Sequence, residues 1–135
     1  MAAPPSWALV IVGKVAMENG RTVLPVLTWR RMRKEFSSGR TWNHRSPATI
    51  VLSAGTDPQD AKRVLVHELA HWLNPSGRED VGTLSKAHSP QFYEIVRRLY
   101  RRFRIPVREA MAYEAEYYPG FVARWRNYKR KKAHP

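Results

Sequence analysis

Residues 64–73, VLVHELAHWL, form an apolar segment that carries two histidines and one glutamate. Ahead of this segment, Asp57 is a residue type that caps helix N-termini, and Pro58 suits the first helical position. After the segment, Pro75 cannot continue a helix and restricts the residue before it to extended geometry. The pattern therefore predicts a helix that begins after Asp57 and ends shortly before Pro75.

The polar residues of this helix are His67, Glu68 and His71, in the spacing HExxH. Residues four apart lie on one face of a helix, about one turn apart, so both imidazoles can reach one metal ion. In such sites the glutamate takes a proton from water bound to the metal. The chain has no cysteine, so any metal must be bound by His, Asp or Glu. A core helix can also carry structural histidines, but the capped helical context favours a zinc site.

A catalytic zinc site needs a third protein ligand. The candidates are His88, Glu94, Glu109 and Glu114. We expect His88 to be the ligand, because the sixteen residues between His71 and His88 are enough for the chain to fold back over the first helix. A lone histidine in a loop is more often a surface residue, so this assignment depends on the second helix packing against the first.

The remaining pattern predicts an α+β fold. Residues 7–17 and 22–31 are both apolar, and the Asn19-Gly20 pair between them favours an antiparallel hairpin. Residues 48–52 predict another strand, and Ser89-Pro90 opens a second amphipathic helix. We therefore expect a small zincin-like domain in which a mainly antiparallel N-terminal sheet packs on the HExxH helix and on a second, C-terminal helix.

Size and charge limit the function classes. A chain of 135 residues suits one domain, and we expect that domain over residues 1–116, followed by a basic tail over residues 117–135. With 24 Lys and Arg against 11 Asp and Glu, the formal net charge of +13 favours polyanionic partners. Nucleic acid is the expected partner of residues 97–132, where basic side chains are interleaved with aromatic rings. The alternative is a solvated helix face followed by a frayed tail. No apolar run reaches the length of a membrane span, so we expect no membrane partner and a cytoplasmic location.

The sequence HELAH at residues 67–71, followed by HSPQF at residues 88–92, resembles the SprT-like zinc metallopeptidases and the related YgjP-like group. The segment ATIVLSAGTDP at residues 48–58 is similar to the strand that these families place before the active helix. The resemblance covers roughly residues 23–104. Many SprT-like proteins also carry a cysteine zinc ribbon or other C-terminal DNA-binding elements, and this chain has no cysteine.

The resemblance implies a zinc metallopeptidase in which His67, His71 and His88 bind Zn²⁺. It further implies that Glu68 activates a zinc-bound water to hydrolyse peptide bonds in a protein or peptide substrate. Some SprT-like relatives cut proteins crosslinked to DNA, which adds a DNA-associated role to the expectation. Two alternatives remain open: a nucleic-acid-binding protein with a structural zinc site, and a regulatory peptidase resembling the ImmA/IrrE type. In the second alternative Glu109 would be the third ligand and the substrate a repressor.

Overall fold

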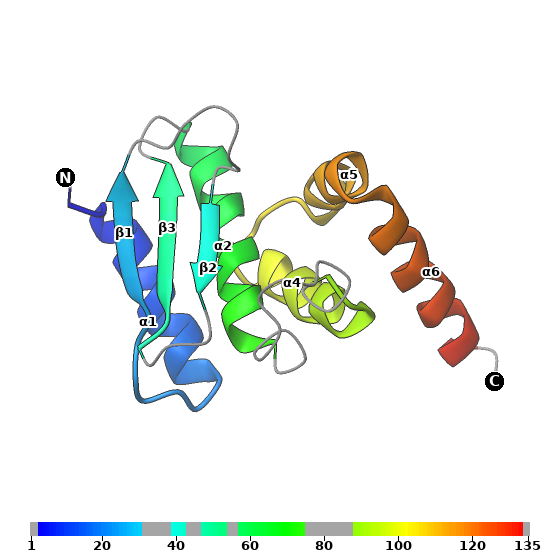
Figure 1. Ribbon diagram of the computed structural model, residues 1–135, viewed down its shortest axis with the longest axis horizontal. Helices are drawn as coiled ribbons and strands as arrows, with labels where there is room; N and C mark the ends of the chain where they lie inside the picture. Colours follow the sequence, from blue (N-terminus) through cyan, green and yellow to red (C-terminus); the bar gives the residue numbers. More distant parts are fainter. Residues whose placement is uncertain (1–2, 31–38, 43–46, 54–56, 75–87, 134–135) are drawn as a thin grey trace.

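The computed structural model describes residues 3–30, 39–42, 47–53, 57–74 and 88–133 (Figure 1). These ranges contain five helices and three strands. In chain order they are α1 Ser6–Glu18, β1 Val26–Arg30, β2 Gly39–Trp42, β3 Thr49–Ser53, α2 Pro58–Leu73, α4 Pro90–Arg102, α5 Val107–Tyr117 and α6 Pro119–Ala133. The predicted α+β class is confirmed.

The sheet is mixed, with strand order β1-β3-β2. Strand β1 pairs with β3 in parallel, with Val26 opposite Thr49, whereas β2 pairs with β3 antiparallel, with Gly39 opposite Leu52. The expectation of a mainly antiparallel sheet is therefore not confirmed. Within the described residues, β1 and β2 are the two edges, and β3, the strand predicted at residues 48–52, lies buried between them.

The prediction of a hairpin over residues 7–17 and 22–31 is wrong, because the first run is helix α1. Its buried side chains follow helical spacing: Ala8, Ile11, Val12, Val15 and Ala16. The Asn19-Gly20 pair ends this helix. Gly20 has a φ of +65°, and the Arg21 N–H donates to the Ala16 carbonyl at 2.8 Å, as in a glycine-terminated helix. The second run becomes β1, which begins directly after Pro25, a residue that has no N–H to donate within a sheet.

The two helices that frame the candidate site begin where their capping residues indicated. The Asp57 side chain accepts a hydrogen bond from the Gln59 N–H at 3.0 Å at the start of α2. The Ser89 hydroxyl accepts one from the Phe92 N–H at 3.3 Å at the start of α4. Helix α2 ends at Leu73, two residues before Pro75. Both helix predictions are confirmed.

Strand β2 lies close against α2. Because Gly39 has no side chain, the strand can approach the helix closely: a Cβ at this position would lie 2.7 Å from Val64 Cγ1 and 3.0 Å from Glu68 Cγ. Any larger residue would push β2 away from the helix that carries the histidines. This strand, which the sequence pattern did not predict, places an edge of the sheet directly beside Glu68.

Helices α5 and α6 pack against α4 on the side of the molecule away from the sheet (Figure 1). Most of the segment expected as a basic tail is thus helical, and α6 buries Val122 and Trp125. The expected domain boundary at residue 117 stays a prediction. No helix in the described ranges has the length and apolar character that a membrane span requires.

Candidate metal centre

Three imidazoles meet where the C-terminal half of α2 faces the start of α4. His67 and His71 lie one turn apart on α2, and His88 directly precedes the Ser89 cap of α4. One ring nitrogen from each histidine lies within 4.8 Å of the other two. The Nε2 atoms of His67 and His71 are 3.1 Å apart. The structure therefore brings together the three histidines predicted from the sequence, in a group that could hold a metal ion.

The rings are supported by apolar packing. Phe92, in the first turn of α4, stacks on His71 with a centroid distance of 4.3 Å and makes T-shaped contacts with His67 and His88. Burial strongly lowers the pKa of His71, and the neighbouring His67 and His88 lower it further. His71 is therefore held as neutral imidazole. This is the form whose lone pair binds a metal, so His71 is suited to bind a divalent cation.

Glu114 of α5 is the buried partner of His67. The His67 Nδ1–H donates to Glu114 Oε1 at 2.5 Å, and the Tyr100 hydroxyl donates to the same oxygen at 2.7 Å. This bond fixes the orientation of the His67 ring and leaves Nε2 on the side of His71. Glu114 had been one of the alternative ligands, but the structure places it behind His67 and not in the histidine group.

His67 and Glu114 each shift the pKa of the other toward the charged form. Burial disfavours protonation of His67, but the Glu114 carboxylate outweighs that effect and raises the pKa of His67. Burial acts in the opposite direction on Glu114, yet His67 and the Tyr100 hydrogen bond lower the pKa of the carboxyl group overall. Glu114 is therefore ionised at neutral pH, although its side chain is almost wholly buried. A carboxylate on this side makes the opposite ring nitrogen a stronger metal ligand.

Glu68 lies beside the histidines and is held by the sheet. Its Oε2 is 4.0 Å from His67 Nε2. The Thr41 hydroxyl of β2 is 2.7 Å from Glu68 Oε1, to which it donates a hydrogen bond, and 3.1 Å from the Glu68 backbone carbonyl. The sequence alone gives no signal for Thr41, because its contact with Glu68 depends on β2 lying against α2. The carboxylate is thus positioned next to the group that could hold the metal.

Tyr118, the residue directly after α5, contacts the histidine group through His88. Its ring stacks on His88 with a centroid distance of 4.1 Å and an interplanar angle of 25°. Burial, together with the negative charges of Glu68 and Glu114, raises the pKa of Tyr118, so the phenol stays protonated. Tyr93, one turn into α4, is fully buried, and His44 lies outside the described residues. Tyr118 is therefore the better candidate to donate a hydrogen bond at the site.

The other carboxylates considered as ligands lie elsewhere. Glu94 is exposed on α4, and Glu109 is exposed in the first turn of α5. Neither belongs to the metal-binding group found among the described residues. The position of Glu109 gives no support to the alternative in which it replaces His88.

Comparisons with models of known protein families, with curated proteins and with solved structures find no match to this chain. The geometry of the site and the residues of the chain therefore carry the functional proposal.

Proposed function

We propose that this protein is a zinc-dependent peptidase, with His67, His71 and His88 as the metal ligands. The observation that carries the proposal is the convergence of three imidazoles within 4.8 Å, with the Glu68 carboxylate 4.0 Å from one of them. Three protein ligands with an open fourth position are typical of catalytic zinc, whereas structural zinc sites are usually closed by four ligands. The resemblance of HELAH and HSPQF to the motifs of SprT-like enzymes agrees with this arrangement.

Bound zinc supplies Lewis acidity, which makes water a nucleophile near neutral pH and polarises the carbonyl of a peptide bond. Glu68 takes the proton of the attacking water on its carboxylate and later delivers it to the leaving amine. Thr41 holds Glu68 Oε1, which keeps the carboxylate oriented while Oε2 lies on the side of His67. Glu114 keeps the His67 ring in place through its Nδ1–H.

The edge strand β2 suits binding of an extended peptide. Within the described residues β2 ends the sheet order β1-β3-β2, and its Thr41 contacts Glu68. A substrate backbone that adds to this edge as a further strand lies beside the histidines, with its main chain held by hydrogen bonds. Because main-chain hydrogen bonds hold the substrate in this mode, binding depends little on the substrate's side chains. We therefore expect unfolded or extended protein segments to be cleaved.

The proposal is tested by measuring zinc and turnover on the same purified protein. We expect one zinc ion per chain and cleavage of a disordered protein, loss of cleavage after removal of zinc by a chelator, and recovery when zinc is added back. Turnover that persists without zinc would contradict the proposal. Stoichiometric zinc without turnover on any extended substrate would instead select the alternative of a structural zinc site.

Glu114 provides a test of the site that does not depend on turnover. We expect Glu114→Gln to weaken zinc binding about 10- to 100-fold, because the neutral amide supports the His67 ring less strongly than the carboxylate. Competition with a chromogenic chelator measures this affinity. Glu116→Gln is the matched control, since Glu116 is exposed on the same helix. Equal zinc affinity in both variants would show that Glu114 only fills space in the core.

A further inference from the structure

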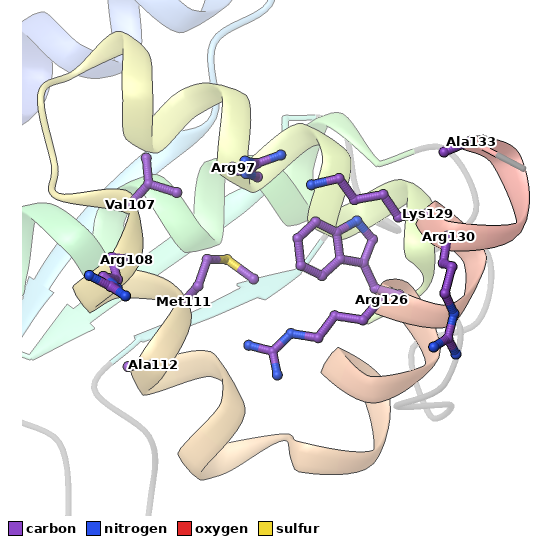
Figure 2. Close-up of a pocket in the computed structure, with 10 residues that line it drawn as sticks. Arg97, Val107, Arg108, Met111, Ala112, Arg126, Lys129, Arg130 and Ala133 are labelled. Carbon is purple, nitrogen blue, oxygen red and sulfur yellow. The ribbon is translucent and has the colours of Figure 1, made fainter.

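A groove lies among α4, α5 and α6, lined by residues that take no part in the metal centre (Figure 2). Its volume is about 830 Å³, within the range of pockets that hold ligands. It is lined by side chains from these three consecutive helices. The groove is thus a second feature of the surface, formed by the C-terminal helices rather than by the sheet.

The groove is strongly basic. Five cations line it, and no acidic side chain does so in the part of the chain that the structure describes. These cations are Arg97 from α4, Arg108 from α5, and Arg126, Lys129 and Arg130 from α6. Figure 2 shows them spread along the groove, with Arg108 toward one end and Arg130 toward the other. This spread fits a ligand with repeated negative charges better than a single anion.

The floor of the groove is apolar, and two of the cations, Arg97 and Lys129, lie against an aromatic ring in it. Trp125 packs there beside Met111, and both are at most 7% exposed. The Arg97 guanidinium lies 5.9 Å from the Trp125 ring centroid, and the Lys129 ammonium lies 5.2 Å from it. Both cations are thus within range of a cation–π interaction with the ring. Less side-chain entropy is then lost when an anion binds.

We propose that this groove binds single-stranded nucleic acid, with phosphates on the cations and bases against the guanidinium planes and the less buried apolar lining residues Val107, Ala112 and Ala133. Four of the five cations are arginines, whose planar guanidinium matches phosphate oxygens in a bidentate geometry. A strand offers both repeated phosphates and flat apolar base faces to one groove, as other single-strand binders exploit. A lipid surface fits less well, because the buried floor presents no apolar side chain that could insert into a bilayer.

The proposal is independent of zinc and of hydrolysis, so its test uses the full chain with zinc content as a separate readout. The probe is a fluorescein-labelled oligodeoxythymidylate of about 20 nucleotides, followed by anisotropy at several salt concentrations. The groove variant is Arg126→Gln with Lys129→Gln. The control removes the same charges outside the groove, as Arg101→Gln with Lys131→Gln. All four side chains are exposed, so neither variant should disturb folding.

We expect the groove variant to lose at least about tenfold in affinity at low salt, and the control to lose much less. Each phosphate contact removed should reduce the slope of log affinity against log salt by about 0.7. Equal losses in both variants would overturn the proposal in favour of diffuse attraction by the net charge. Binding of only a free nucleotide, or equal or tighter binding of duplex DNA or phosphatidylserine vesicles through the same residues, would overturn it as well. Unchanged zinc content in the groove variant separates these outcomes from failure of the peptidase proposal.

Discussion

Replacing Glu68 with Gln should lower the rate of peptide cleavage about 10²- to 10⁴-fold, the contribution typical of a positioned acid–base group. The amide keeps the size of the side chain and can still accept a hydrogen bond from Thr41, which lies 2.7 Å from the carboxylate in the wild type. It cannot take the proton of the attacking water. The loss should therefore appear in kcat, while zinc content and the free energy of unfolding stay close to those of the wild type.

Glu94→Gln is the matched control for this experiment, because Glu94 is an exposed carboxylate on the neighbouring helix α4. Both variants remove one negative charge, so a general effect of charge would appear in both. Wild-type turnover in Glu68→Gln would contradict the role given to this residue, whatever the zinc content. A loss of zinc in Glu68→Gln would mean that the carboxylate helps to hold the metal rather than to move a proton.

The parts of the site that the sequence predicted depend on local signals. Asp57, Pro58 and Ser89 act within one turn of their own helices, so the starts of α2 and α4 could be read directly. The spacing of His67 and His71 fixes their common face in the same way. His88 needed one further assumption, that the second helix folds back onto the first. The structure brings it within 4.8 Å of the other two.

The parts that were missed depend on tertiary contacts or on ambiguous patterns. A short run of Val, Leu and Ile is compatible with a buried strand or a buried helix, and Asn-Gly suits both a hairpin turn and a helix C-terminus. Helix α1 was misread for this reason. Thr41 and Tyr118 reach the site only through the packing of β2 and the path of the chain after α5. One signal for Glu114 was present, because it is a carboxylate in line with the buried Ala110 and Met111 on the inner face of α5.

His88→Gln should weaken zinc binding by more than the 10- to 100-fold expected for loss of a supporting partner, because it removes a ligand. Two histidines remain one turn apart on α2, and a pair alone binds zinc weakly. We expect substoichiometric zinc after purification and no measurable turnover, while circular dichroism should still show the helices. The Phe92 and Tyr118 rings that pack against His88 can accommodate a glutamine of similar length.

The decisive comparison is with Glu109→Gln, which removes the ligand of the alternative ImmA/IrrE-like arrangement. Glu109 is exposed in the first turn of α5, so its replacement should leave zinc content and turnover unchanged. The reverse result, with zinc retained in His88→Gln and lost in Glu109→Gln, would require α5 to turn its exposed face toward α2. That movement would pull Glu114 out of its hydrogen bonds with His67 and Tyr100 and would leave a carboxylate and an imidazole unpaired in the core. The free-energy cost of leaving these buried groups unpaired applies whether or not a metal is bound. The same pair of variants therefore tests the identity of the third ligand and also the packing of α5 against His67.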